Sequence, residues 1–157
     1  LESLSRISRE DYGLAGAVQH GASTLPRELF NKFPELETAE IHLATEFQNM
    51  IYDHDRFPAD FKDKIYTHLR EKFASEKKDA DTDEQFIYKT RKKGFGEFKS
   101  EFWNLPDNIK SEISKKLENK LEFLFKQLKV ENTMDIIEKT IRPIKISPNL
   151  DNEIAAA

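Results

Sequence analysis

The amino-acid sequence predicts an α/β fold in which two strand–helix units are followed by a mainly helical section. Residues 14–19 form a continuous apolar run, which is typical of a strand buried on both faces of a parallel sheet. Residues 38–44 form a second run of strand length. A helical pattern follows each run, which gives the order of βα units. Buried helices in place of the strands are the alternative, but both runs are too short to favour them.

Local signals mark the helices of this first section. Residues 1–12 carry a helical pattern, and Gly13 follows at the C′ position, where glycine adopts a left-handed backbone at little cost. Pro26 suits the first turn of a second helix, which we expect to end at Pro34. Thr45 is suited to cap a third helix.

After Pro58 the pattern becomes helical. Apolar residues recur at every fourth position of one segment, at Phe61, Ile65, Leu69 and Phe73. Thr82 and Gln85 have the spacing of a capping box and predict the start of another helix. The longest helix is expected after Asp107, with an apolar stripe formed by Ile109, Ile113, Leu117, Leu121, Leu124, Phe125 and Leu128.

Composition limits the classes of function. The net charge of −4 does not favour binding to nucleic acid. No apolar run approaches the ~20 residues that span a bilayer. The absence of cysteine excludes thiolate metal sites and fits a reducing compartment, so we expect a cytoplasmic protein. We divide the 157 residues into a strand-containing segment (1–74), a helical extension (75–140) and an extended tail (141–157).

The residues directly after the first predicted strand carry the strongest indication of chemistry. His20 offers an imidazole that suits zinc, Gly21 lets an anion approach the backbone, and Ser23 offers a hydroxyl. The helix start near Pro26 adds favourable partial charge. In parallel α/β folds, function collects at the carboxyl ends of the strands. The alternative is a tight turn with a buried, hydrogen-bonded histidine.

A second group follows the second predicted strand. Thr45 could donate to a phosphate shared with Ser23, because adjacent strand ends lie ~5 Å apart. A plain helix cap is the alternative for Thr45. His42 alternates with Ile41 and Leu43 and therefore faces the opposite side, where it either points into a site or is a satisfied core residue.

Three other groups favour structural explanations. Residues 53–55, Asp-His-Asp, follow a helix end and are expected in a solvated loop, with His54 near the helix carbonyls. His68 is expected on the surface or at its rim. The basic run at residues 89–93 could meet a phosphate or an acidic partner, although a solvated helix face is the usual explanation.

The segment around His20 resembles the C-terminal part of a class II, metal-dependent fructose-bisphosphate aldolase, specifically the larger, divergent members with a helical C-terminal extension. In that family a strand ends in a His-Gly-Gly-Ser-Gly pattern, whose histidine binds the catalytic zinc and whose glycine and serine hold a substrate phosphate. The resemblance implies that His20 binds zinc and that Gly21 and Ser23 bind phosphate. Ala22 and Thr24 replace the family's second and third glycines.

The family's next strand carries an asparagine, then an acidic or small polar residue, then a threonine that binds phosphate. Thr45 matches that threonine, and Glu46 matches the residue that often follows it. His42 stands in place of the asparagine that contacts the reacting carbons, so the resemblance implies a catalytic role for His42. Ala44 replaces the polar residue, and the matching motifs cover about residues 13–53.

The resemblance also implies a fold and an activity. The fold would be the last two βα units, strands seven and eight, of a (β/α)8 TIM barrel, followed by the helical extension. The activity would be that of a zinc-dependent lyase of carbohydrate metabolism and glycolysis, which cleaves or forms a ketose phosphate, as a homo-oligomer in its complete form. The family's other zinc ligands and its proton-transferring aspartate belong to the first six strands, so we expect this polypeptide alone to be inactive. A non-catalytic helical interaction module and a metal-free phosphate-sensing domain are the alternative functions.

Overall fold

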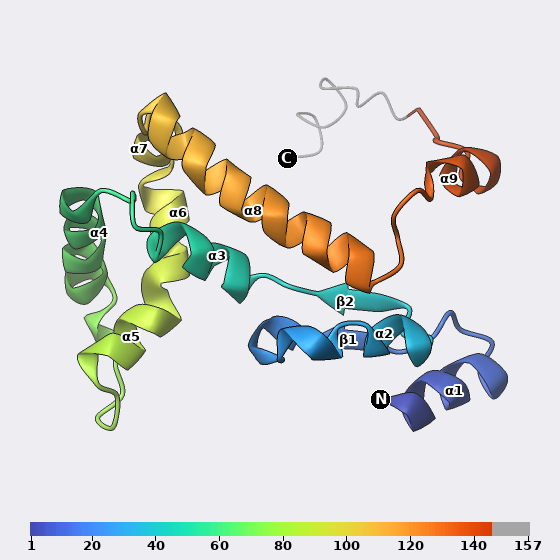
Figure 1. Ribbon diagram of the computed structural model, residues 1–157. Helices are drawn as coiled ribbons and strands as arrows, with labels where there is room; N and C mark the ends of the chain where they lie inside the picture. Colours follow the sequence, from blue (N-terminus) through green and yellow to red (C-terminus); the bar gives the residue numbers. More distant parts are fainter. Residues whose placement is uncertain (146–157) are drawn as a thin grey trace, which may run out of the picture.

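The computed structural model describes residues 1–145, which form helices and one small sheet; α4 to α7 group at the end of the molecule away from the sheet (Figure 1). The α-helices and strands are α1 (Glu2–Glu10), β1 (Val18–His20), α2 (Lys32–Glu35), β2 (Glu40–His42), α3 (Thr45–Tyr52), α4 (Ala59–Lys72), α5 (Asp83–Thr90), α6 (Gly94–Glu97), α7 (Lys99–Trp103), α8 (Asp107–Gln127) and α9 (Met134–Thr140). Short 3-10 turns are η1 (Ala22–Thr24), η2 (Arg27–Leu29), η3 (Ala74–Glu76) and η4 (Arg91–Lys93). Across residues 1–145, no helix is both long and apolar enough to cross a bilayer.

The predicted pair of TIM-barrel βα units is wrong. Helices account for 63% of the structure, and the described residues contain one sheet of two short parallel strands. The class is mixed, and the predicted parallel pairing of the two strands is confirmed. The first strand is shorter than predicted because Gly16, in the middle of the apolar run, has a φ of 141° and bends the chain. Leu14 is 62% exposed, so this run is not buried between two layers of helices.

Other local predictions had mixed outcomes. Helix α1 ends at Glu10 with Asp11 as its C-cap, so Gly13 lies one residue beyond the predicted C′ position, although it has a left-handed φ of 65°. The single helix expected from Pro26 to Pro34 is wrong, because the chain forms η2 and then α2, with Pro34 inside α2. Thr45 is the first residue of α3 rather than its cap; the N-cap is Ala44, which offers no side-chain hydrogen bond to the helix. The capping box of Thr82 and Gln85 is confirmed in both hydrogen bonds.

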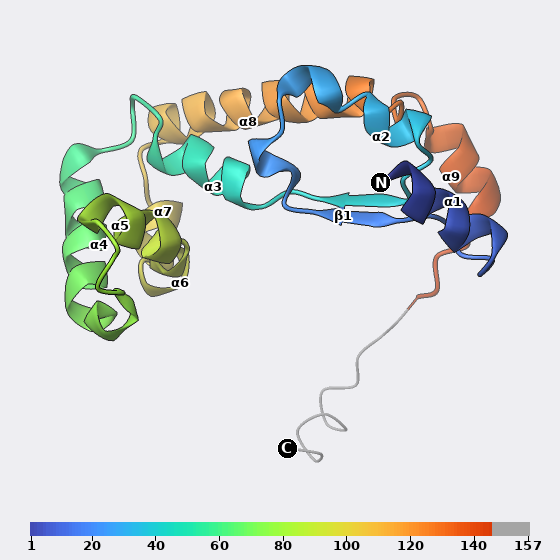
Figure 2. The ribbon, with the colours of Figure 1, turned by 90° about the horizontal axis from the view of Figure 1, so that it is seen from below.

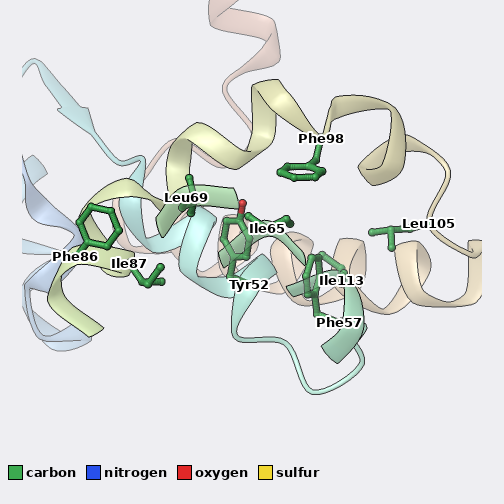
Figure 3. Close-up of a cluster of buried hydrophobic side chains, with 9 residues drawn as sticks. All are labelled: Tyr52, Phe57, Ile65, Leu69, Phe86, Ile87, Phe98, Leu105 and Ile113. Carbon is green, nitrogen blue, oxygen red and sulfur yellow. The ribbon is translucent and has the colours of Figure 1, made fainter. Parts of the chain in front are cut away.

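Two apolar clusters hold the helices together, and α8 joins them. Figure 3 shows the larger cluster, which consists of Tyr52, Phe57, Ile65, Leu69, Phe86, Ile87, Phe98, Leu105 and Ile113. The smaller cluster, beside the sheet, consists of Ala22, Phe30, Phe33 and Leu124. The stripe of α8 is thus mainly internal core, although Leu121 and Phe125 are exposed.

The division of the chain at residue 74 stays a prediction, and the larger cluster draws side chains from both sides of that position. Residues 141–145 of the predicted tail form no helix or strand, and residues 146–157 lie outside the described part.

The buried side chain of Arg91 joins η4 to α3. Its Nη1 donates to Asp53 Oδ1 over 2.8 Å, and its Nη2 donates to Asn49. Tyr52 donates its hydroxyl to the carbonyl of Arg91 over 2.9 Å. Burial is the largest single influence and lowers the pKa of Arg91, but the interactions with Asp53 and Tyr66 together outweigh it, so the pKa is raised. The basic run at residues 89–93 is therefore not simply a solvated face, since its central residue is an internal connector.

Candidate functional site

The sheet places His20 and His42 side by side. The two residues are directly paired in the register of β1 and β2, and their rings stack with centroids 4.4 Å apart at 21°. Both lie on the exposed face of the sheet, whereas Gln19 and Ile41 are partly buried on the other face. The prediction that His42 faces away from Ile41 is confirmed, and the resulting position is open to solvent.

Glu40 is a member of this group that the sequence analysis missed. Its Oε1 lies 2.6 Å from Nε2 of His42, because residues two apart on a strand share one face. The signal in the sequence was the position of Glu40 two residues before His42. The carboxylate can orient the His42 imidazole through this contact.

The turn after β1 brings the next predicted residues close to the histidines. Gly21 has a φ of 73°, in the left-handed region where glycine is favoured, and it is exposed. The chain then enters η1, where Ala22 is fully buried in the smaller cluster and Ser23 is half-buried. Burial of Ala22 fixes the turn while its neighbours stay accessible.

Thr45 reaches the same region from β2. Both strands run toward α3 (Figure 2), and η1 contacts α3. Thr45 is exposed in the first turn of α3, whose first backbone N–H groups have no side-chain cap. This arrangement brings the Ser23 and Thr45 segments to one end of the sheet, near uncapped donors that favour an anion. Glu46, in contrast, forms an ion pair with Lys120 over 2.6 Å.

The other two histidines do not join this group. His54 is half-buried and accepts a hydrogen bond from the backbone of Arg56 over 3.1 Å, within its own turn. His68 is half-buried as well, and its ring lies 5.2 Å from that of Phe98. Asp53 is engaged by Arg91, which argues against a metal site at residues 53–55.

The imidazoles at this end of the sheet are suitable ligands for a transition metal, but they are too few to form a complete site. Imidazoles are good zinc ligands, and catalytic zinc sites use about three protein ligands. Within residues 1–145, no group of three or more histidine, aspartate or glutamate side chains is arranged to hold a metal ion. A metal at His20 would therefore complete its coordination with water or with ligands from outside the described residues.

Comparisons with protein-family models, curated proteins and solved structures returned no match. The likeness to class II aldolases thus rests on the residues at the two strand ends.

Proposed function

We propose that this chain supplies part of the active site of a metal-dependent aldolase that cleaves or forms a ketose phosphate. The observation that carries the proposal is the register pairing of His20 with His42, which gathers the residues after both strands at one end of the sheet. A sheet end of this kind is where parallel strands commonly present functional groups.

The phosphate would bind between the two loops. Gly21 leaves the backbone accessible, Ser23 and Thr45 offer hydroxyl donors, and the start of α3 adds N–H groups. In many nucleotide and sugar-phosphate sites, phosphate oxygens accept hydrogen bonds from donors of these kinds.

The two histidines would have different roles. His20 would ligate the metal through a neutral imidazole, and His42, oriented by Glu40, would contact the reacting part of the substrate. When bound, zinc supplies a Lewis acid that polarises a carbonyl oxygen. His42 would then hold or donate a proton at its imidazole nitrogen on the side away from the carboxylate.

The proposal requires further chain to complete the site, as in a homo-oligomeric, cytoplasmic enzyme. It is supported by the sheet itself, because a two-stranded sheet is marginal alone and, within residues 1–145, neither outer edge pairs with another strand. Val18, on the same face as His20, is 47% exposed.

Binding of fructose 1,6-bisphosphate in the presence of zinc tests the proposal. We expect saturable shifts of the backbone amide signals of Gly21 and Ser23, and affinity at least about tenfold weaker in Ser23→Ala and Thr45→Ala. A hydrogen bond to a charged group contributes about 1.5–3 kcal/mol, which corresponds to that loss. Ser3→Ala, at an exposed position of α1, is the matched control. Equal affinity in Ser23→Ala and Ser3→Ala would contradict the phosphate-binding role.

A further inference from the structure

A second polar pocket lies between η2, α3 and α8. Its lining includes Glu46, the residue after Thr45, but none of the residues proposed to bind zinc or the sugar phosphate. Its volume is about 310 Å³, and it is lined by Arg27, Glu46, Met50, Lys116, Asn119 and Lys120. Helices α3 and α8 contact one another, and Figure 1 shows them side by side. The pocket is large enough for a small phosphate ester, since ligand pockets begin near ~300 Å³.

Part of the pocket lining is an ion pair between the buried Lys120 and the partly buried Glu46. Lys120 is only 8% exposed, and its Nζ lies 2.6 Å from Glu46 Oε1. The same Nζ lies 5.3 Å from the ring centroids of both Phe30 and Phe123. Glu46 therefore neutralises Lys120, and this pair fixes the shape of the pocket rather than leaving a free charge.

Two further cations line the pocket without such compensation. The guanidinium carbon of Arg27 lies 4.3 Å from the ring centroid of Phe123, which holds the side chain in place. Neither Arg27 nor Lys116 has an ion-pair partner within residues 1–145. Three cations and one carboxylate leave a formal excess of two positive charges in the lining.

We propose that this pocket binds the phosphate group of a small phosphorylated molecule. A phosphate monoester carries ≈ −1.5 to −2 charge at pH 7, which matches the excess. The planar guanidinium of Arg27 can donate parallel hydrogen bonds to two phosphate oxygens, and the ammonium of Lys116 adds a positive charge. The amide of Asn119 can donate a further hydrogen bond, and Glu46 can accept one from a hydroxyl of the esterified alcohol. Met50 provides an apolar wall.

Inorganic phosphate is the probe for this proposal. The purified chain is titrated at constant ionic strength, and the side-chain amide signal of Asn119 and the Nε–H signal of Arg27 are followed by NMR. We expect saturable shifts and at least a tenfold loss of affinity in Lys116→Ala. Arg27→Lys, which keeps the charge and removes the fork, is expected to weaken binding several-fold.

Lys115 provides the matched control, because it is the neighbouring exposed lysine on α8 and does not line the pocket. Lys115→Ala should bind phosphate within about twofold of the unchanged chain. A loss in Lys115→Ala equal to that in Lys116→Ala, or the same shifts with chloride, would overturn the proposal. In Ser23→Ala, the Asn119 and Arg27 signals should still shift with phosphate. A loss of phosphate binding in this pocket can therefore be told apart from a loss of binding at the proposed aldolase site.

Discussion

At the residue scale, the candidate site follows from the way in which successive side chains of a strand point to opposite faces of the sheet. Glu40 and His42 share one face of β2, and register pairing adds His20 from β1. The alternation of His42 with Ile41 was readable in the sequence. The stacking of His42 on His20 was not, because register between two short strands depends on their connections and packing.

Glycine 94 shows how closely single residues are packed in the larger cluster. A Cβ at this position would lie 2.6 Å from Tyr52 Oη and 2.7 Å from Ile65 Cγ2. We therefore predict that Gly94→Ala lowers the free energy of unfolding by about 1–3 kcal/mol, as overpacking does. Chemical denaturation followed by circular dichroism measures this change.

Gly96 is the control for that substitution, since it lies in the same helix, α6, and a Cβ there meets nothing within 4 Å. Gly96→Ala should be neutral or stabilise by up to about 1 kcal/mol, because alanine favours helix. Similar destabilisation by both variants would mean that α6 does not pack against Tyr52 as described.

At the element scale, helices with regular signals were predictable and the strands were less so. The apolar stripe of α4 and the capping box of α5 were both confirmed, because each depends on neighbours along one helix. The predicted extent of β1 was wrong, because the backbone conformation of Gly16 that shortens the strand depends on packing against a distant part of the chain. A Cβ at Gly16 would lie 2.5 Å from the carbonyl oxygen of Glu37, far along the chain.

The contact between α4 and α5 has a predictable pH dependence. Arg70 of α4 donates twice to Asp83 Oδ2, at 3.1 and 2.8 Å, and the hydrogen bond lowers the pKa of Asp83. Because the folded pKa lies below the unfolded value of about 3.9, the stabilisation is present above that pH. It is lost as the pH falls through the folded pKa.

We predict that Asp83→Asn lowers the melting temperature at pH 6, and that the difference from the unchanged chain shrinks below about pH 4. Thermal melts at a series of pH values measure this difference, which should be small because the pair is exposed. Asp79→Asn, at an exposed position in the segment that precedes α5, is the control. A difference that grows toward low pH would contradict the assigned contact.

At the scale of the whole molecule, α8 organises the described residues. Ile113 packs in the larger cluster and Leu124 in the smaller one, so a single helix spans both (Figure 1). The sequence indicated this helix and its stripe. It did not indicate that Lys120 would be buried beside Glu46, because burial of a charge depends on which distant residue pairs with it.

The barrel prediction failed at the same scale. A motif of a few residues carries local chemistry, whereas the number of strands in a sheet depends on how many segments are available to pair. The residues His20, Ser23 and Thr45 nevertheless lie toward one end of the sheet, so the proposed chemistry depends on this sheet end and not on a barrel.

Zinc titration followed by the imidazole Cε1–H signals of all four histidines tests the central claim most directly. We expect the signals of His20 and His42 to shift together and saturate, while those of His54 and His68 stay unchanged. His20→Ala should abolish the response of His42, whereas His68→Ala should preserve it. No response from His20, or equal responses from all four histidines, would contradict a metal site at this end of the sheet.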